Sequence, residues 1–75
     1  MIIEVGDDIL GKNIQIWREK RGMYPVTLAE RTGIPADIIS GLEKGVIRAV
    51  DYDDLLHLSC ALGATLENLI EDNRK

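Results

Sequence analysis

Apolar residues recur at spacings of three and four along most of this chain, and single glycines interrupt the pattern. This spacing places apolar side chains on one face of a helix, and a glycine directly after such a run is typical of a helix C-terminus. In the first run, Leu10, Ile14 and Trp17 are followed by Gly22. The pattern predicts an all-α fold of five helices, at about residues 8–21, 25–32, 36–43, 52–62 and 66–71.

The residues just before each run are types that commonly start helices. Asp and Thr side chains cap helix N-termini, and proline is favoured in the first turn, where its missing N–H is not needed. The expected starts are Asp7 or Asp8, Pro25, Pro35, Asp51 with Asp54 as a variant capping box, and Thr65.

The core of a chain this short has to be built mainly from aliphatic side chains, because three of its 75 residues are aromatic. We expect a single domain over residues 1–75, with a short extended segment over 1–7 and frayed residues at 72–75. Ile38 is expected on the buried face of the third helix. The residues expected at the centre of the core are Trp17, Leu28, Ile34, Ile39, Leu42, Leu55, Leu58 and Leu62.

Residues 2–5 are the one stretch with a strand-like composition. Ile2, Ile3 and Val5 are β-branched, but so short a segment cannot form a sheet alone. These residues could pack against the first or the last helix, or could pair as strands across a dimer.

The net charge of −4 is unusual for a protein that binds nucleic acid. Its distribution is uneven, because residues 12–48 carry +3 whereas residues 1–11 carry −3 and residues 49–75 carry −4. A basic middle permits a DNA-facing surface. The single Cys60 excludes an internal disulfide and, with no signal peptide or membrane span in the sequence, predicts a cytoplasmic protein without a membrane partner.

The most informative motif spans residues 25–44. Small Ala29 precedes Gly33 by four residues, and this spacing suits two helices that cross closely at a tight turn. Gly33 falls where a left-handed backbone is needed. Ile39 and Leu42 would anchor the second helix. The motif predicts a helix-turn-helix, although any compact bundle with a glycine turn would satisfy it.

A longer set of segments carries a family resemblance: Leu10-Gly11, Trp17-Arg18, Arg21-Gly22-Met23, Leu28 to Ile34, Leu42 to Gly45, Ala61-Leu62-Gly63 and Leu66 to Ile70. Over residues 9–71 their order and spacing resemble the phage repressor/Cro (Xre-type) helix-turn-helix family. The resemblance implies a five-helix lambda-repressor-like DNA-binding domain that acts in transcription control. It also implies a homodimer on double-stranded operator DNA, with the third helix in the major groove.

The resemblance also implies a structural ion pair. Arg18 and Glu43 occupy positions that form a partly buried pair in the family, and each adjoins an apolar residue, Trp17 and Leu42. A buried charge without its partner is strongly destabilising. The alternative is two solvated surface charges.

The positions that match the family's DNA contacts are Tyr24, Arg31, Ala36, Asp37, Ser40, Gly41, Lys44 and Arg48. Here the sequence departs from the family, which often has Gln, Ser, Thr or Arg at the base-reading positions. Ala36 can contact only a thymine methyl group, Asp37 repels phosphate and could read only a cytosine amino group, and Gly41 has no side chain. Pro25 stands where the family often has a phosphate-binding glutamine. We therefore expect mainly phosphate contacts and sparse reading of bases.

A second functional class is a protein-interaction module, an antagonist or accessory of a repressor that kept the fold and lost DNA binding. The net charge of −4 and the scarcity of base-reading side chains on the third helix favour this class. Catalysis is not expected, because one histidine and no paired nucleophile cannot assemble a catalytic site. Asp53, Asp54, His57 and Cys60 fall at helical spacing, but carboxylates suit a helix start anyway. We expect no metal site and no cofactor.

Overall fold

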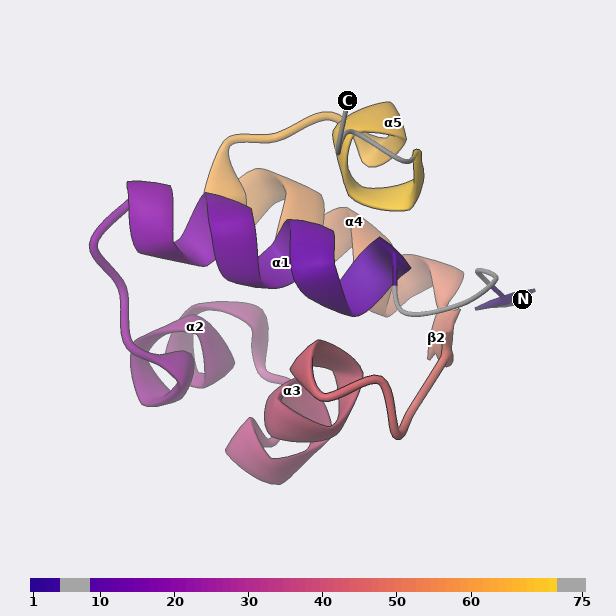
Figure 1. Ribbon diagram of the computed structural model, residues 1–75, viewed down its shortest axis with the longest axis horizontal. Helices are drawn as coiled ribbons and strands as arrows, with labels where there is room; N and C mark the ends of the chain where they lie inside the picture. The colour runs from indigo at the N-terminus through magenta and orange to yellow at the C-terminus, as the bar shows by residue number, and fades with distance from the viewer. Residues whose placement is uncertain (5–8, 72–75) are drawn as a thin grey trace.

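Five helices and one short antiparallel sheet make up the computed structural model of the chain, which describes residues 1–4 and 9–71 (Figure 1). Every helix lies within one residue of its predicted bounds, and the predicted fold class is confirmed. The expected cap at Asp7 or Asp8 and the expectations for residues 5–7 and 72–75 lie outside the described residues. In chain order the elements are β1 (Ile2–Glu4), α1 (Ile9–Lys20), α2 (Pro25–Thr32), α3 (Ala36–Glu43), β2 (Ala49–Asp51), α4 (Tyr52–Leu62) and α5 (Leu66–Ile70).

Helix α1 crosses the middle of the molecule, with α2 and α3 on one side and α5 on the other (Figure 1). The described helices are all short, and none is long and apolar enough to cross a membrane. Asn13 of α1 is almost fully buried and donates to the carbonyls of Leu69 and Glu71, at 2.9 and 2.7 Å. This amide satisfies carbonyls at the C-terminus of α5 that have no partner within the helix.

Several predicted helix ends are confirmed. Pro25 is the first residue of α2, where its missing N–H costs no hydrogen bond. Gly33 ends α2 in the left-handed region, with φ 77° and ψ 7°. Thr65 caps α5 in a capping box with Asn68, in which each side chain accepts from the other residue's amide.

Two predicted helix-start signals need correction. Pro35 is not in the first turn of α3 but is the residue before it, with an extended backbone, and the helix begins at Ala36 as its predicted range has it. The expected capping box of Asp51 with Asp54 is wrong, because the Asp51 carboxylate accepts from the amide of Asp53 at 3.0 Å. This single bond still caps α4.

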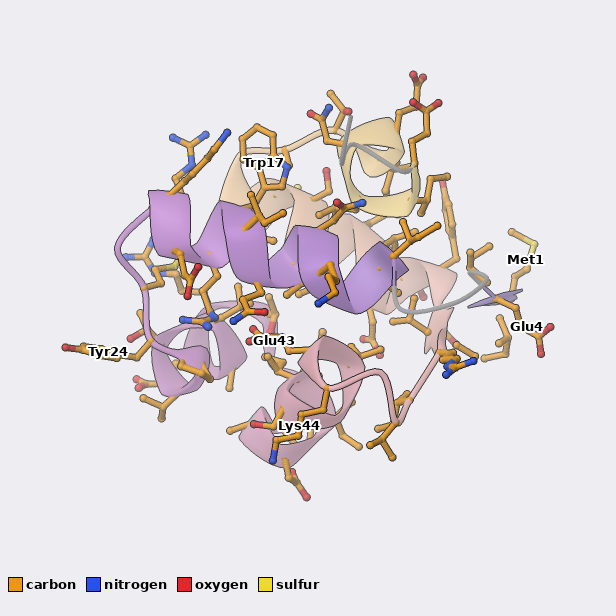
Figure 2. All side chains as sticks on the ribbon, viewed as in Figure 1. Met1, Glu4, Trp17, Tyr24, Glu43 and Lys44 are labelled. Atoms are coloured by element: carbon orange, nitrogen blue, oxygen red, sulfur yellow. The ribbon has the colours of Figure 1, made fainter. Side chains whose placement is uncertain are left out.

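The predicted core is correct for the aliphatic residues and wrong for Trp17. In α1 the buried face continues from Ile14 to Arg18, one full turn later, which leaves Trp17 at the flank and half-buried. Figure 2 shows Trp17 on the side of α1 away from α2 and α3. Ile38 is also wrong as a buried residue, because it lies beside Ile39 on α3 and is 38% exposed. The expected core residues that are buried are Leu28, Ile34, Ile39, Leu42, Leu55, Leu58 and Leu62.

Gly11 allows the backbones of α1 and α3 to touch. A Cβ atom added at Gly11 would lie 1.8 Å from the carbonyl oxygen of Leu42 and 3.0 Å from the Cα of Glu43. Both atoms belong to the backbone and cannot move aside as a flexible side chain can. The absence of a side chain at residue 11 therefore sets how closely the end of α3 approaches α1.

The strand-like residues 2–4 pair within the chain. β1 runs antiparallel to β2, with Ile2 opposite Asp51, Ile3 opposite Val50 and Glu4 opposite Ala49. The sequence predicted that these residues pack on a helix or pair across a dimer, and neither prediction includes β2 as their partner. Its residues carry no distinct strand signal, because β2 is three residues long and runs directly into α4.

Candidate nucleic-acid interface

Helices α2 and α3 form a helix-turn-helix around a braced turn. The amide of Gly33 donates to the carbonyl of Ala29 at 2.9 Å. The Thr32 hydroxyl donates to the carbonyl of Leu28 at 2.8 Å and accepts from the amide of Ile34 at 3.2 Å. Because the turn has these local hydrogen bonds on both sides, the direction in which α3 leaves it is well defined.

Burial divides α3 into an inward and an outward face. Ile39 and Leu42 are inward and almost fully buried. At 100° per residue, the opposite face carries Asp37, Gly41 and Lys44; Asp37 and Lys44 are exposed, whereas Gly41 is half-buried. Four of the predicted DNA-binding residues, Ala36, Asp37, Ser40 and Gly41, are thus brought together on one helix, with Lys44 directly after it.

The other predicted contacts lie on either side of α3. Tyr24 stands before the first residue of α2 and is 74% exposed, whereas Arg31 is exposed in the last turn of that helix. Figure 2 shows Tyr24 and Lys44 pointing outward from α2 and α3. Arg48 follows α3, and its Nε donates to the carbonyl of Gly45 at 3.1 Å. This bond holds the Arg48 cation close to the C-terminus of α3.

Arg18 and Glu43 join α1 to α3 directly. The guanidinium Nε lies 2.8 Å from Oε2 of Glu43, and Nη2 lies 3.0 Å from Oε1. Nη1 of Arg18 also donates to the carbonyl of Met23 at 2.7 Å, and the two charged side chains are 10% and 11% exposed. Hydrogen bonding to Glu43 raises the pKa of Arg18 above its ordinary value despite burial, so the pair favours the charged form of the arginine.

Two other cations of the basic middle, Lys20 and Arg21, are exposed but interact with groups of the same chain. Arg21 donates to the carbonyl of Leu62 at 2.8 Å, at the C-terminus of α4. Lys20 and Arg21 also flank the Trp17 ring, with their charged groups 4.9 and 5.7 Å from its centroid. Arg31, Lys44 and Arg48 therefore supply exposed positive charge around α3.

Three apolar residues near this surface were not anticipated. Val26 in the first turn of α2 is 56% exposed, and Val46 after α3 is 78% exposed. Ile47 is half-buried, and a Cβ atom at Gly41 would lie 2.6 Å from its Cδ1. The available signal was Gly41 itself, because a glycine within a helix leaves room for another group to approach the backbone closely.

The residues considered as metal ligands do not gather into a site. His57 and Cys60 are exposed on α4. Within residues 1–4 and 9–71, no three His, Cys, Asp or Glu side chains lie close enough together to hold a metal ion.

Comparison with solved structures places the fold among repressor-type DNA-binding domains. The N-terminal DNA-binding domain of SinR from Bacillus subtilis matches with a TM-score of 0.85 and 20% identity, covering 91% of this chain and 99% of that one. The P22 c2 repressor in complex with synthetic operator 9T matches with a TM-score of 0.79 and 25% identity, covering 87% and 97%. A hypothetical transcription factor, NHTF from Neisseria, matches with a TM-score of 0.80 and 19% identity, covering 96% and 87%.

The sequence comparisons give a family as well as a fold. No significant match appears among curated protein sequences. The family model of the Cro/C1-type helix-turn-helix DNA-binding domain matches residues 13–75, which is most of the chain and includes α2, α3 and the turn between them. Because this family model covers most of the chain, including the whole helix-turn-helix, the chain belongs to the Cro/C1-type helix-turn-helix DNA-binding domain family.

Proposed function

We propose that this chain is a transcriptional regulator of the Cro/repressor type that places α3 in the major groove of operator DNA. The observation that carries the proposal is the outward face of α3. Ile39 and Leu42 bury the opposite face of the helix in the core, and exposed cations flank the outward face. A helix fits the width of the major groove, and positive charge around it attracts the phosphates on either side.

Affinity rests mainly on the DNA backbone. Arg31, Lys44 and Arg48 contact phosphates, and Tyr24 offers its hydroxyl as a further donor. The helix starts add few backbone donors, because Pro25 has no N–H and the amides of Thr27 and Ile38 already donate to the carbonyls that precede their helices. The remaining donors are the amides of Val26, Ala36 and Asp37. Together these contacts fix the position of α3 on the duplex without reading its sequence.

Base contacts come from few side chains. Asp37 accepts a hydrogen bond, Ser40 can donate or accept one, and Ala36 offers a methyl group. Within α3 no arginine or lysine precedes its C-terminal cap, so the donors that usually read guanine are missing from the helix. Specificity therefore depends on these three residues and on DNA shape.

The active species on DNA is a homodimer, which acts as a repressor. The major groove returns to the same side of the duplex every helical turn, so two copies related by a two-fold axis can place their α3 helices in successive grooves. The P22 c2 repressor, a structural relative, has been solved on operator DNA, which supports this mode of binding.

One observation favours a second candidate function, a protein-interaction module. Tyr24 and Val26 at the start of α2 and Val46 after α3 are all more than half exposed, and α3 itself carries the exposed Asp37. An exposed apolar surface of this kind also suits a protein partner. On this alternative the chain would be an antagonist or accessory of a repressor.

A selection of bound fragments from random duplex DNA at low salt tests the proposal. The wild type is expected to recover a two-fold-symmetric sequence, and a variant with Lys44→Ala and Arg48→Ala is expected to recover much less DNA. The matched control is Lys20→Ala, because Lys20 lies over Trp17 on the far side of α1. If the wild type retains no duplex at low salt, DNA binding is excluded and the interaction module becomes the better account.

A further inference from the structure

The side chain of Ile47 lies over Gly41, at the position on α3 where residue 41 would otherwise carry its own side chain. Gly41 has no side chain, and the place of its Cβ is 2.6 Å from Cδ1 and 3.0 Å from Cγ1 of Ile47. The carbonyl of Gly41 accepts from the amides of Val46 and Ile47, at 3.0 Å each. These two bonds hold the segment after α3 against the helix. Ile47, which is half-buried and also packs against the core, thereby covers the position where a residue with a side chain would project its own.

A carboxylate lies next to this apolar group. Asp37 is exposed and precedes Gly41 by four residues, so their Cβ positions are about 5–6 Å apart on neighbouring turns. Val46, which is 78% exposed, directly precedes Ile47 and adds a second apolar side chain to this segment. The outward face of α3 thus presents a hydrogen-bond acceptor and a methyl-rich surface side by side.

The base edges of the major groove differ in how well they match this pair. Guanine offers two acceptors, which the Asp37 carboxylate repels, and thymine has a methyl group beside the O4 acceptor. Adenine has an amino donor but no methyl group, and cytosine has an amino donor beside a bare C5–H. Among single bases, a methyl group on C5 of cytosine gives the one combination that satisfies both parts, a donor next to a methyl group.

We propose that α3 reads 5-methylcytosine in duplex DNA, with the Asp37 carboxylate accepting from the N4 amino group and the side chains of Ile47 and Val46 contacting the 5-methyl group. This inference rests on the proposed function, because it requires α3 to lie in the major groove. It assigns a role in specificity to two residues outside α3. The cations Lys44 and Arg48 offset the repulsion between Asp37 and the neighbouring phosphates.

The test uses random duplexes about two helical turns long, prepared once with cytosine and once with 5-methylcytosine throughout. A duplex recovered from the methylated pool is then synthesised with cytosine, with 5-methylcytosine, or with T·A pairs at the preferred positions. Wild type is expected to bind the 5-methylcytosine duplex about fourfold more tightly than the cytosine duplex for each contacted methyl group. It should also prefer 5-methylcytosine to thymine.

Two variants separate the roles of the acceptor and of the apolar surface. Asp37→Ala should abolish the preference for 5-methylcytosine over thymine, because both bases keep the methyl group. Val46→Ser with Ile47→Ala should reduce the preference for 5-methylcytosine over cytosine, and its thermal melt shows whether the domain remains folded. Val26→Ala, on α2, is the control and should leave both ratios unchanged.

The outcomes distinguish this inference from the proposed function. Equal binding of the cytosine and 5-methylcytosine duplexes by wild type would overturn the inference and leave DNA binding intact. The same conclusion follows if Asp37→Ala keeps the full preference over thymine. If no duplex of either pool is retained at low salt, the proposed function fails and the inference falls with it.

Discussion

The guanidinium of Arg18 and the carboxylate of Glu43 meet in two parallel hydrogen bonds, of 2.8 and 3.0 Å, that tie the end of α1 to the end of α3. Figure 2 shows Glu43 in the space between the two helices. A third bond from Arg18 to the carbonyl of Met23 fixes the guanidinium in place. The pair therefore orients the proposed recognition helix on the rest of the domain, and its geometry is the bidentate form that arginine makes with carboxylates.

Glu43→Ala is expected to lower the free energy of unfolding by about 3 kcal/mol, because it leaves the buried Arg18 charge without its partner. The double variant with Arg18→Ala should lose less than the sum of the two single variants. Urea denaturation of all four proteins gives the coupling energy. A coupling indistinguishable from zero would show that the two charges do not interact in solution.

Gly11→Ala should destabilise the domain by about 1–3 kcal/mol or more, because the added methyl group meets the backbone of Leu42 and Glu43. Alanine normally favours a helix over glycine, so the expected sign is opposite to that of helix propensity. Gln15→Ala in the same helix is the control and should change stability little. An increase in melting temperature for Gly11→Ala would contradict the close approach of α1 and α3.

Local signals in the sequence were sufficient to predict the helices and their ends, because a cap or a left-handed glycine acts within a few residues. The errors concern residues whose surroundings depend on distant parts of the chain. Periodicity alone does not show that Arg18, rather than Trp17, continues the buried face of α1. The partner strand of residues 2–4 follows α3 and has no pattern of its own.

The candidate site shows the same division. The family resemblance identified the cations and the outward positions of α3, which depend on helix spacing. The position of Ile47 over Gly41 depends on the fold of the segment after α3, which hydrophobic spacing does not describe. The sequence therefore predicts an empty position at Gly41, whereas in the structure the side chain of Ile47 occupies it.

Leu42→Ala should reduce the free energy of unfolding by about 2–5 kcal/mol, because it removes a buried side chain and leaves a cavity in the hydrophobic core. Ile38→Ala is the matched comparison on the same helix. It should cost clearly less, since Ile38 is 38% exposed and Leu42 is 1% exposed. Similar losses for both variants, measured by thermal or chemical denaturation, would contradict the assigned orientation of α3.

Asp37→Asn should raise the affinity for unmethylated duplex DNA of random sequence about fivefold at low salt, because a charge that repels phosphate is removed. The gain should shrink as salt is added, since exposed charges are screened. Fluorescence anisotropy with one labelled duplex measures it. Glu67→Gln removes an exposed carboxylate of α5, on the opposite side of α1 from α3, and serves as the control (Figure 1). An equal gain for both variants would mean that net charge, and not the position of Asp37, sets the affinity.

The salt dependence of duplex binding tests the central claim, that α3 and its flanking cations form a DNA-binding surface. For wild type, log affinity should fall linearly with log salt, with a slope of about −3 per subunit if Arg31, Lys44 and Arg48 each contact a phosphate. Lys44→Ala should flatten the slope by about one, whereas Lys20→Ala, beside Trp17, should leave it unchanged. Duplex binding that is absent at low salt, or a slope that Lys44→Ala does not alter, would contradict the account.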